Sequence, residues 1–149
     1  MARLIASFFG SGLLLRQVRA TDGGSGTVAG FAALALALLI DPWWGRLLAL
    51  MTVLIAGWWA VKTLDLGDED PGWVVIDEVA GTLLATVGLA VTGAVVAFVI
   101  FRIADIRKGL FPGVASAERL RGPTGIMADD LVAGLYGLVA GWFVQLLIR

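Results

Sequence analysis

The chain alternates long apolar runs with polar stretches. The apolar runs cover residues 27–40, 47–64, 79–101 and 131–148. The polar stretches between them cover residues 16–26, 65–78 and 102–130. A helix that spans a bilayer needs about 20 apolar residues, so the third run is long enough, the second and fourth are close, and the first is short. The pattern predicts an all-α fold, a compact bundle of several apolar helices that forms one domain over residues 1–149.

The third apolar run fits a membrane better as a hairpin than as a single crossing. With four single crossings, lysine and arginine divide almost evenly between the two sides of the membrane, so the positive-inside rule assigns no orientation. With a bend near residues 88–93, about nine of them lie on one side against about two on the other. Each half of the hairpin covers only about half of the hydrocarbon, so neighbouring helices must shield it. We therefore expect an integral membrane bundle partly sunk in the cytosolic leaflet, with its polar site on the cytosolic side.

Composition supports a membrane environment. Hydrophobic residues make up 59% of the chain and charged residues 15%, and the mean hydropathy is +0.92, which is too apolar for a core covered by a polar surface. Tryptophans lie at or near the ends of the apolar runs, where indole rings favour the headgroup layer: Trp43, Trp44, Trp58, Trp59, Trp73 and Trp142. Residues 1–20 are broken by Gly10-Ser11-Gly12, so we expect an interfacial segment there rather than a cleaved signal peptide.

Charge and the missing residue types restrict the chemistry. A net charge of -1 and the lack of a basic stripe interleaved with aromatic residues argue against a nucleic-acid partner. The chain has no cysteine and no histidine, which removes thiolate nucleophiles, disulfides, the commonest general base and the commonest metal ligand. Any reaction must therefore use oxygen ligands and cationic side chains.

Two pairs of adjacent acids, Asp77–Glu78 and Asp129–Asp130, are expected at the entries of apolar helices. The helix dipole favours acids there, so capping explains one member of each pair but does not require two. Small residues follow both pairs at helical spacing: Gly81, Ala85, Gly88 and Thr92 after the first pair, and Gly134, Gly137 and Gly141 after the second. Such faces let helices approach closely, so the carboxylates converge if the two faces meet. Close packing without any site is the alternative interpretation.

Converging carboxylates indicate a bound cation. Without one, acids near a low dielectric repel one another and take up protons, whereas hard oxygen ligands favour Mg²⁺ or a similar ion. Such an ion binds one or two carboxylates together with a substrate phosphate, whose charge Arg102 and Lys108 would neutralise. The glycine-rich residues 23–27 add flexible N–H groups before an apolar helix, which is a weak indication of a phosphate seat. The residues thus favour metal-assisted phosphoryl chemistry.

Five motifs in this order resemble those of the phosphatidylglycerophosphatase A family: FFGSG, GTVAGFAALAL, DPGWVVIDEVAG, FRIADIRKG and GIMADDLVAGLY. The resemblance implies a Mg²⁺-dependent lipid phosphatase that converts phosphatidylglycerophosphate to phosphatidylglycerol. It further implies a multi-pass protein of the bacterial inner membrane whose active site faces the cytoplasm. The chain departs from the family pattern at Ser25, Ala29, Gly109 and Pro123-Thr124. These departures lie in expected loops and bear on headgroup selectivity more than on the reaction.

The resemblance also implies the site residues. Catalytic roles are carried over to Asp77, Glu78, Asp105, Asp129 and Asp130. Substrate contacts are carried over to Gly26, Thr27, Arg102 and Lys108. Ligands for one or two Mg²⁺ ions are expected among Asp77, Glu78, Asp129 and Asp130, with Asp70 as a further candidate.

Several alternatives stay open at the level of the sequence. Water or an aspartate can be the nucleophile, and Asp105 can be a further ligand or the general base. The phospholipid and the bilayer are the expected partners, and a homo-oligomer is compatible with the sequence. A small ion or proton transporter is a second functional class, because intramembrane acids often mark conduction paths. A metal-dependent phosphatidyltransferase is disfavoured, because its Asp-Gly-x-x-Ala-Arg motif is missing.

Overall fold

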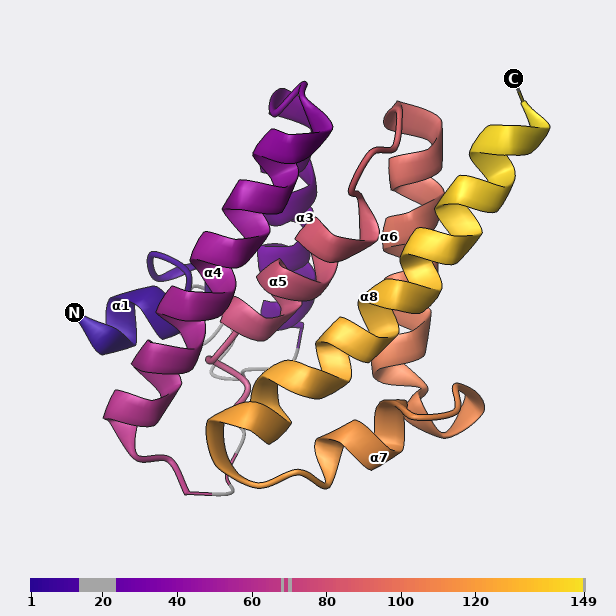
Figure 1. Cartoon of the computed structure of the whole chain (residues 1–149). Helices are drawn as coiled ribbons and strands as arrows, with labels where there is room; N and C mark the ends of the chain where they lie inside the picture. The colour runs from indigo at the N-terminus through magenta and orange to yellow at the C-terminus, as the bar shows by residue number, and fades with distance from the viewer. Residues whose placement is uncertain (14–23, 68, 70, 149) are drawn as a thin grey trace.

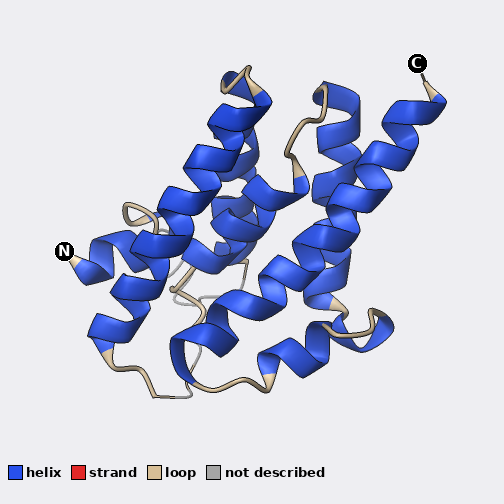
Figure 2. Cartoon of the chain, viewed as in Figure 1, coloured by secondary structure: helices blue, strands red, loops and turns tan. Residues whose placement is uncertain are grey.

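The computed structural model describes residues 1–13, 24–67, 69 and 71–148, and Figure 1 shows how they are arranged. The described elements are α1 (Ala2–Ala6), α3 (Ser25–Leu39), α4 (Trp43–Leu64), α5 (Ile76–Ala85), α6 (Val91–Ile106), η1 (Lys108–Leu110), α7 (Val114–Glu118) and α8 (Gly122–Leu147). Figure 2 shows helices and loops but no strand in this part of the chain, which confirms the all-α prediction. Asp70 and residues 14–20 of the expected interfacial segment lie outside the described residues.

The third apolar run forms two helices, as the hairpin interpretation predicts. α5 ends at Ala85 and α6 begins at Val91, and Figure 1 shows α6 running back along the bundle beside α8. Gly88 lies in the break with a φ of +72°, a left-handed conformation that glycine adopts without steric cost. The break lies slightly earlier than the predicted residues 88–93, because α5 ends at Ala85 and α6 has already formed at Val91. Neighbouring helices bury most of α5.

Two polar side chains satisfy the backbone at the break between α5 and α6. Arg46 of α4 is 6% exposed and donates hydrogen bonds to the carbonyl oxygens of Thr86 and Leu89, both at 2.7 Å. Gln145 of α8 accepts a hydrogen bond from the Ala90 N–H at 2.6 Å. Groups at helix ends have no partner within the helix and must find one elsewhere. Side chains of α4 and α8 therefore make this interruption possible inside the bundle.

The expectation that Asp129 and Asp130 lie at a helix entry is wrong. α8 begins at Gly122 rather than near residue 131, which places both acids within the helix. Pro123 fits the first turn, where the N–H group of a helix has no internal acceptor. The polar sequence before residue 131 conceals this early start, because hydropathy alone does not distinguish a polar helical turn from a loop.

The charged residues around Asp77 and around Arg102 also lie on helices. Asp77 and Glu78 occupy the first turn of α5, as predicted. α6 extends to Ile106, so Arg102 and Asp105, which the apolar pattern assigns to a loop, belong to its last turns. Arg102 Nη1 lies 2.7 Å from Asp105 Oδ2, three residues further along the helix. An ion pair at this spacing supports the helical conformation.

The small-residue faces of α5 and α8 meet backbone to backbone. A Cβ added to Gly134 would lie 2.7 Å from the Gly81 carbonyl oxygen, and one added to Gly81 would lie 2.8 Å from the Asp130 carbonyl oxygen. Further along α8, a Cβ on Gly141 would lie 2.7 Å from the carbonyl oxygen of Gly93 in α6. A Cβ atom does not approach a carbonyl oxygen so closely, so glycine is required at these contacts.

Two helices, α4 and α8, are long and apolar enough to cross a membrane. α4 carries Trp43 and Trp44 at its start and Trp58 and Trp59 near its end, and these four side chains are 43–61% exposed. Exposed indole rings at both ends of an apolar helix match the aromatic belts at the two surfaces of a bilayer. Length, composition and these rings together favour a membrane environment for α4.

Replacing Gly134 by alanine is expected to separate α5 from α8. The new Cβ would meet backbone atoms, which cannot turn aside as a side chain does, so we expect a loss of about 1–3 kcal/mol in the free energy of unfolding. Thermal unfolding in detergent micelles, followed by circular dichroism, measures the loss. Gly109→Ala is the matched control, because an added Cβ there has nothing within 4 Å. Equal unfolding midpoints for the two variants would contradict a backbone contact at Gly134.

Candidate active site

Three carboxylates from two helices converge where α5 packs against α8. Asp77 and Glu78 come from the first turn of α5, and Asp130 comes from α8. Each offers one ligand oxygen, and the three oxygens lie within 4.8 Å of one another. The contact between Gly81 and the Asp130 backbone places the acids of the two helices at this separation. The structure thus brings these three acids together through the small-residue faces of α5 and α8.

The burial of this cluster, defined by Asp77, Glu78 and Asp130, fits a bound cation. Asp77 is 5% exposed and Asp130 is 3% exposed. Glu78 Oε2 and Asp130 Oδ1 are buried and have no hydrogen-bond partner among the described residues. A buried carboxylate oxygen is costly unless a donor or a cation compensates its lost hydration. Hard oxygen donors at this spacing suit Mg²⁺ better than a softer metal.

Burial raises the pKa of Glu78 above its ordinary value. The hydrogen bond with Asp77 and the charge of Arg102 oppose this rise, whereas the charge of Asp105 adds to it. A carboxyl group with a raised pKa holds its proton more readily when no cation is near. A cation that binds to this cluster therefore displaces a proton from it.

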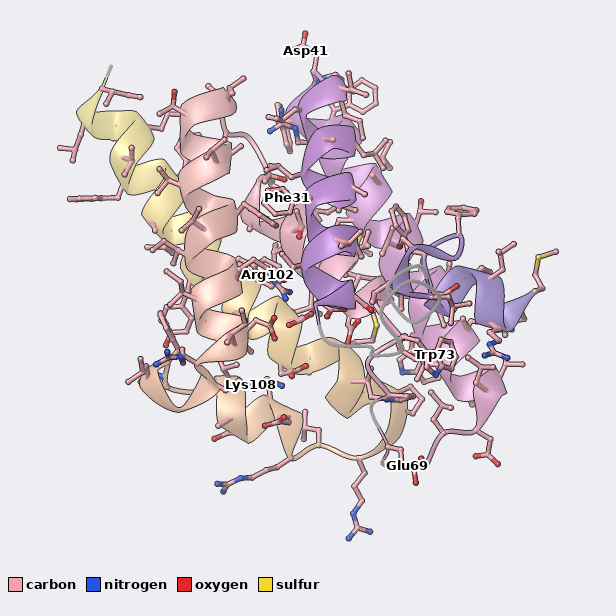
Figure 3. The ribbon with its side chains drawn as sticks, turned by 180° about the vertical axis from the view of Figure 1, so that it is seen from behind. Phe31, Asp41, Glu69, Trp73, Arg102 and Lys108 are labelled. Atoms are coloured by element: carbon pink, nitrogen blue, oxygen red, sulfur yellow. The ribbon has the colours of Figure 1, made fainter. Side chains whose placement is uncertain are left out.

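Arg102 links the cluster to α3. Its Nη2 donates a hydrogen bond to Thr27 Oγ1 at 3.3 Å, while its Nη1 forms the ion pair with Asp105. The Nε of Arg102 is buried and has no hydrogen-bond partner among the described residues. Figure 3 shows Arg102 between Phe31 and Lys108 on one face of the bundle. The guanidinium therefore keeps one donor available beside the cluster.

Asp105 lies beside the cluster but is not one of the three acids that share the 4.8 Å group. Its charge acts on Glu78, on Asp129 and on Asp130, so it is close to both pairs of acids. The ion pair with Arg102 compensates the carboxylate of Asp105. This placement fits a group that exchanges a proton near the cluster at least as well as a ligand.

Asp129 pairs with Lys108 and does not belong to the three-carboxylate group. Lys108 Nζ lies 2.6 Å from Asp129 Oδ2 and 2.8 Å from Glu118 Oε1. Burial alone would lower the pKa of Lys108, but the hydrogen bonds and charges of Asp129 and Glu118 outweigh it and raise the pKa above its usual value. The charged ammonium thus connects η1, α7 and α8. Nothing in the spacing of the sequence marks Glu118 as its second partner.

Gly26 makes room for Glu78 at the start of α3. A Cβ added to Gly26 would overlap with Glu78 Oε1, so the carboxylate lies directly against the first turn of α3. The N-terminus of a helix stabilises a nearby negative charge. The glycine-rich stretch therefore supports an acid of the cluster, and a contact of Gly26 with phosphate stays a prediction.

Two buried hydroxyl groups of α3 and α5 were not singled out as site residues by the sequence. Ser25 precedes Gly26 in α3, and Thr82 lies in α5; both are 0% exposed. Neither hydroxyl oxygen has a hydrogen-bond partner among the described residues. Thr82 follows Glu78 by four residues, so helical spacing is the signal that could have placed it on the same face. Ser25 offered no such signal beyond its position in a glycine-rich stretch.

An all-helical scaffold that holds buried carboxylates beside a guanidinium and an ammonium defines an oxygen-ligand site suited to phosphoryl chemistry. The sequence profile described as phosphatidylglycerophosphatase A matches residues 4–145. The chain therefore belongs to the phosphatidylglycerophosphatase A family, and it is an enzyme of the phosphatase class. The family resemblance found in the motifs is confirmed.

Two relatives extend this result. A Haemophilus influenzae protein named phosphatidylglycerophosphatase A is 31% identical over 149 residues, which cover 95% of this chain and 87% of that protein. A Bacteroides thetaiotaomicron protein named provisionally as a phosphatidylinositol-3-phosphatase is 36% identical over 99 residues, which cover 60% of this chain and 61% of that protein. No solved structure matches the chain at a significant level. Both names describe phosphatases that act on phospholipids.

Removing Lys108 is expected to leave Asp129 as an uncompensated buried charge. A double-mutant cycle with Lys108→Met, Asp129→Asn and the double variant isolates the energy of the pair. We expect a coupling free energy of about 0.5–3 kcal/mol, so the double variant should be more stable than the two single losses predict when added. Unfolding of the wild type and the three variants in detergent micelles gives the four free energies of the cycle. Strictly additive losses would show that the ion pair does not stabilise the fold.

Proposed function

We propose that this protein is a Mg²⁺-dependent lipid phosphatase that hydrolyses the phosphate monoester of phosphatidylglycerophosphate. Water cleaves the terminal P–O ester bond, and the products are phosphatidylglycerol and inorganic phosphate. The observation that carries the proposal is the buried group of Asp77, Glu78 and Asp130 beside the guanidinium of Arg102. Family membership and the name of the Haemophilus influenzae relative support this choice of substrate.

We place the protein in the bacterial inner membrane as a multi-pass protein whose site faces the cytoplasm. α4 and α8 are long enough to cross, and the α5–α6 hairpin enters and returns. Figure 3 shows Lys108 toward one end of the bundle and Asp41 at the other. The loops at the Lys108 end also hold further cations: Arg107, Arg119 and Arg121. The positive-inside rule favours the cytoplasm for that end.

The residues that would hold the ion are Asp77, Glu78 and Asp130. When bound, Mg²⁺ supplies Lewis-acid stabilisation for the charge that develops on the phosphate oxygens. The buried oxygens of Glu78 and Asp130 support this assignment, because no protein donor among the described residues compensates them. The first turn of α3 at Gly26 fixes the position of the Glu78 carboxylate.

The other charged residues act on the substrate or on one another. Arg102 binds a phosphate oxygen through its available Nε, and Thr27 orients the guanidinium by accepting from Nη2. Asp105 accepts the proton of the attacking nucleophile, because it lies beside the cluster without belonging to it. Asp129 positions Lys108, whose ammonium stays charged and attracts the anionic headgroup.

A transporter that uses intramembrane carboxylates is the less favoured function. The buried acids of the described residues are Asp77, Asp129 and Asp130. Asp77 and Asp130 belong to the cluster, and the charge of Asp105 acts on both Asp129 and Asp130. Conduction requires a series of polar groups across the bilayer, whereas these acids gather in one region beside two cations. Membership of a phosphatase family also favours hydrolysis.

Replacing Asp130 by asparagine keeps the size of the side chain and removes its charge. We expect phosphate release to fall by more than a hundredfold, a loss of about 3 kcal/mol in transition-state stabilisation. Steady-state release of phosphate from detergent-dispersed phosphatidylglycerophosphate measures the effect. Asp41→Asn is the matched control, because Asp41 is exposed at the other end of the bundle and should keep its activity. Near-normal turnover by Asp130→Asn would remove this residue from the site.

Chelation of divalent ions with EDTA is expected to abolish the activity, and added Mg²⁺ should restore it. The assay gives the purified protein phosphatidylglycerophosphate, phosphatidic acid and phosphatidylinositol 3-phosphate separately. We expect the fastest release from phosphatidylglycerophosphate. Full activity in EDTA would refute the dependence on a metal, and no release from any of the three lipids in Mg²⁺ would refute the phosphatase proposal. Fastest release from the inositol lipid would assign the chain to a different headgroup.

A further inference from the structure

A groove between α3 and α6 opens beside the candidate active site. Its volume is about 530 Å³, which is in the range of about 300–1,000 Å³ that is typical of small-molecule sites. Phe31 of α3 and Phe98 and Val99 of α6 form part of its wall. The rings of Phe31 and Phe98 pack with their centroids 4.9 Å apart, although Phe31 remains 59% exposed. The groove, called the α3–α6 groove below, therefore presents an apolar surface to whatever surrounds the bundle.

Arg102 stands between the α3–α6 groove and the acidic cluster. Arg102 and Thr27 line the groove and are joined by the hydrogen bond from Nη2 to Oγ1. The same guanidinium pairs with Asp105, and its charge acts on Glu78. One side chain thus borders an apolar wall and a site for phosphate. A molecule that joins an apolar chain to a phosphate group matches both surfaces.

The apolar surface continues along α6 beyond the groove. Val91, Val95, Val99 and Ile103 follow one another at intervals of four residues, so they lie on one helical face. Their side chains are 43–63% exposed. α6 runs toward η1 and α7 at its last turn, so this stripe leads from the far end of the bundle to Arg102 (Figure 1). A row of exposed apolar side chains marks a surface that lipid or a ligand covers.

The α3–α6 groove differs in charge from a second apolar groove, which lies between α4 and α8. The second groove has a volume of about 390 Å³, and its wall includes Ile55 and Trp58 of α4 and Leu131 of α8. None of the described residues that line it is charged. In contrast, Arg102 and Arg107 both line the α3–α6 groove. A lipid with a phosphate monoester is anionic, so charge complementarity favours the α3–α6 groove for the substrate.

We propose that the α3–α6 groove binds an acyl chain of the lipid substrate and admits it sideways from the membrane. The chain lies against Phe31 and Val99, and Arg102 stands at the boundary between the chain and the phosphate. The inference rests on the proposed function, since it takes a lipid phosphate monoester as the substrate. It adds the path by which that lipid reaches the acids and the residues that hold its apolar part.

Photo-crosslinking tests the location of the chain directly. The probe is a phosphatidylglycerophosphate analogue with a diazirine on one acyl chain, and the protein is the full chain in detergent micelles with EDTA to prevent turnover. Mass spectrometry then locates the adducts. We expect adducts on the α3 and α6 segments that carry Phe31 and Val99, and an excess of unlabelled substrate should suppress them. Adducts at the α4–α8 groove, or adducts that the unlabelled lipid does not suppress, would overturn the inference.

Filling the groove provides a second, kinetic test. Val99→Trp occupies the groove from a position that is 48% exposed, and Val139→Trp makes the same change on α8 at a position that is 69% exposed. The measured quantity is the ratio of kcat/KM for the acylated substrate to that for the deacylated headgroup. We expect Val99→Trp to lower the preference for the acylated substrate about tenfold. This is the effect expected when about two methylene groups of the acyl chain are no longer buried in the groove. The loss should come from KM of the lipid more than from kcat.

The control and the wild type make the outcomes distinct. Val139→Trp should keep the wild-type preference, because this residue lies outside both grooves. An unchanged preference in a Val99→Trp variant with a wild-type circular dichroism spectrum would overturn the inference, and the crosslinking test decides the question if that variant does not fold. Wild-type protein that releases no phosphate from any lipid would refute the proposed function itself. Turnover by the wild type with adducts elsewhere would refute only the groove.

Discussion

The close contact of α5 with α8 at Gly81 and Gly134 is the constraint on which the site depends. α5 has 10 residues, too few to cross a bilayer, so packing against α8 and not the membrane fixes its position. Because both contact residues lack a side chain, the acids one turn before each of them share the same small space. A larger residue at either position would separate Glu78 from Asp130. Arg46 also holds α5 in position. It donates hydrogen bonds to the carbonyl oxygens of Thr86 and Leu89 just after α5, where the backbone has no partner within a helix.

Two cations beside the cluster also pair with acids outside it. Arg102 pairs with Asp105, and Lys108 pairs with Asp129 and Glu118. These pairs hold the two cations in place, and the charge of Arg102 also acts on Glu78. A cation bound by the cluster would compensate the charge of its carboxylates, while the paired cations remain in place for an anionic headgroup.

The sequence predicted more of the helical pairing than of the helix ends. Hydropathy predicted the apolar helices. The small-residue spacing after Asp77 and Asp130 gave each helix a face suited to close packing, and the structure shows these two faces in contact. Hydropathy failed at the start of α8, because a polar helical turn and a loop have the same hydropathy. The sequence therefore placed Asp129 at a helix entry. Neighbouring acids on a helix project in different directions, so Asp129 pairs with Lys108 while Asp130 joins the cluster. Such a division depends on the rotation of α8, which its packing sets and its own sequence does not reveal.

The organisation of α6 joins the chemistry of the site to the physical state of its substrate. Its exposed apolar face runs from Val91 to Ile103, and Arg102 and Asp105 lie in the same last turns of the helix. A lipid whose acyl chain lies along this face places its phosphate beside Arg102. The apolar face and the guanidinium therefore favour the same depth for the phosphate in the membrane. That depth is also where the first turns of α3 and α5 meet at Gly26 and Glu78. By contacting the acyl chain, α6 thus also positions the phosphate. A phosphate ester without an acyl chain lacks this contact and is aligned less well.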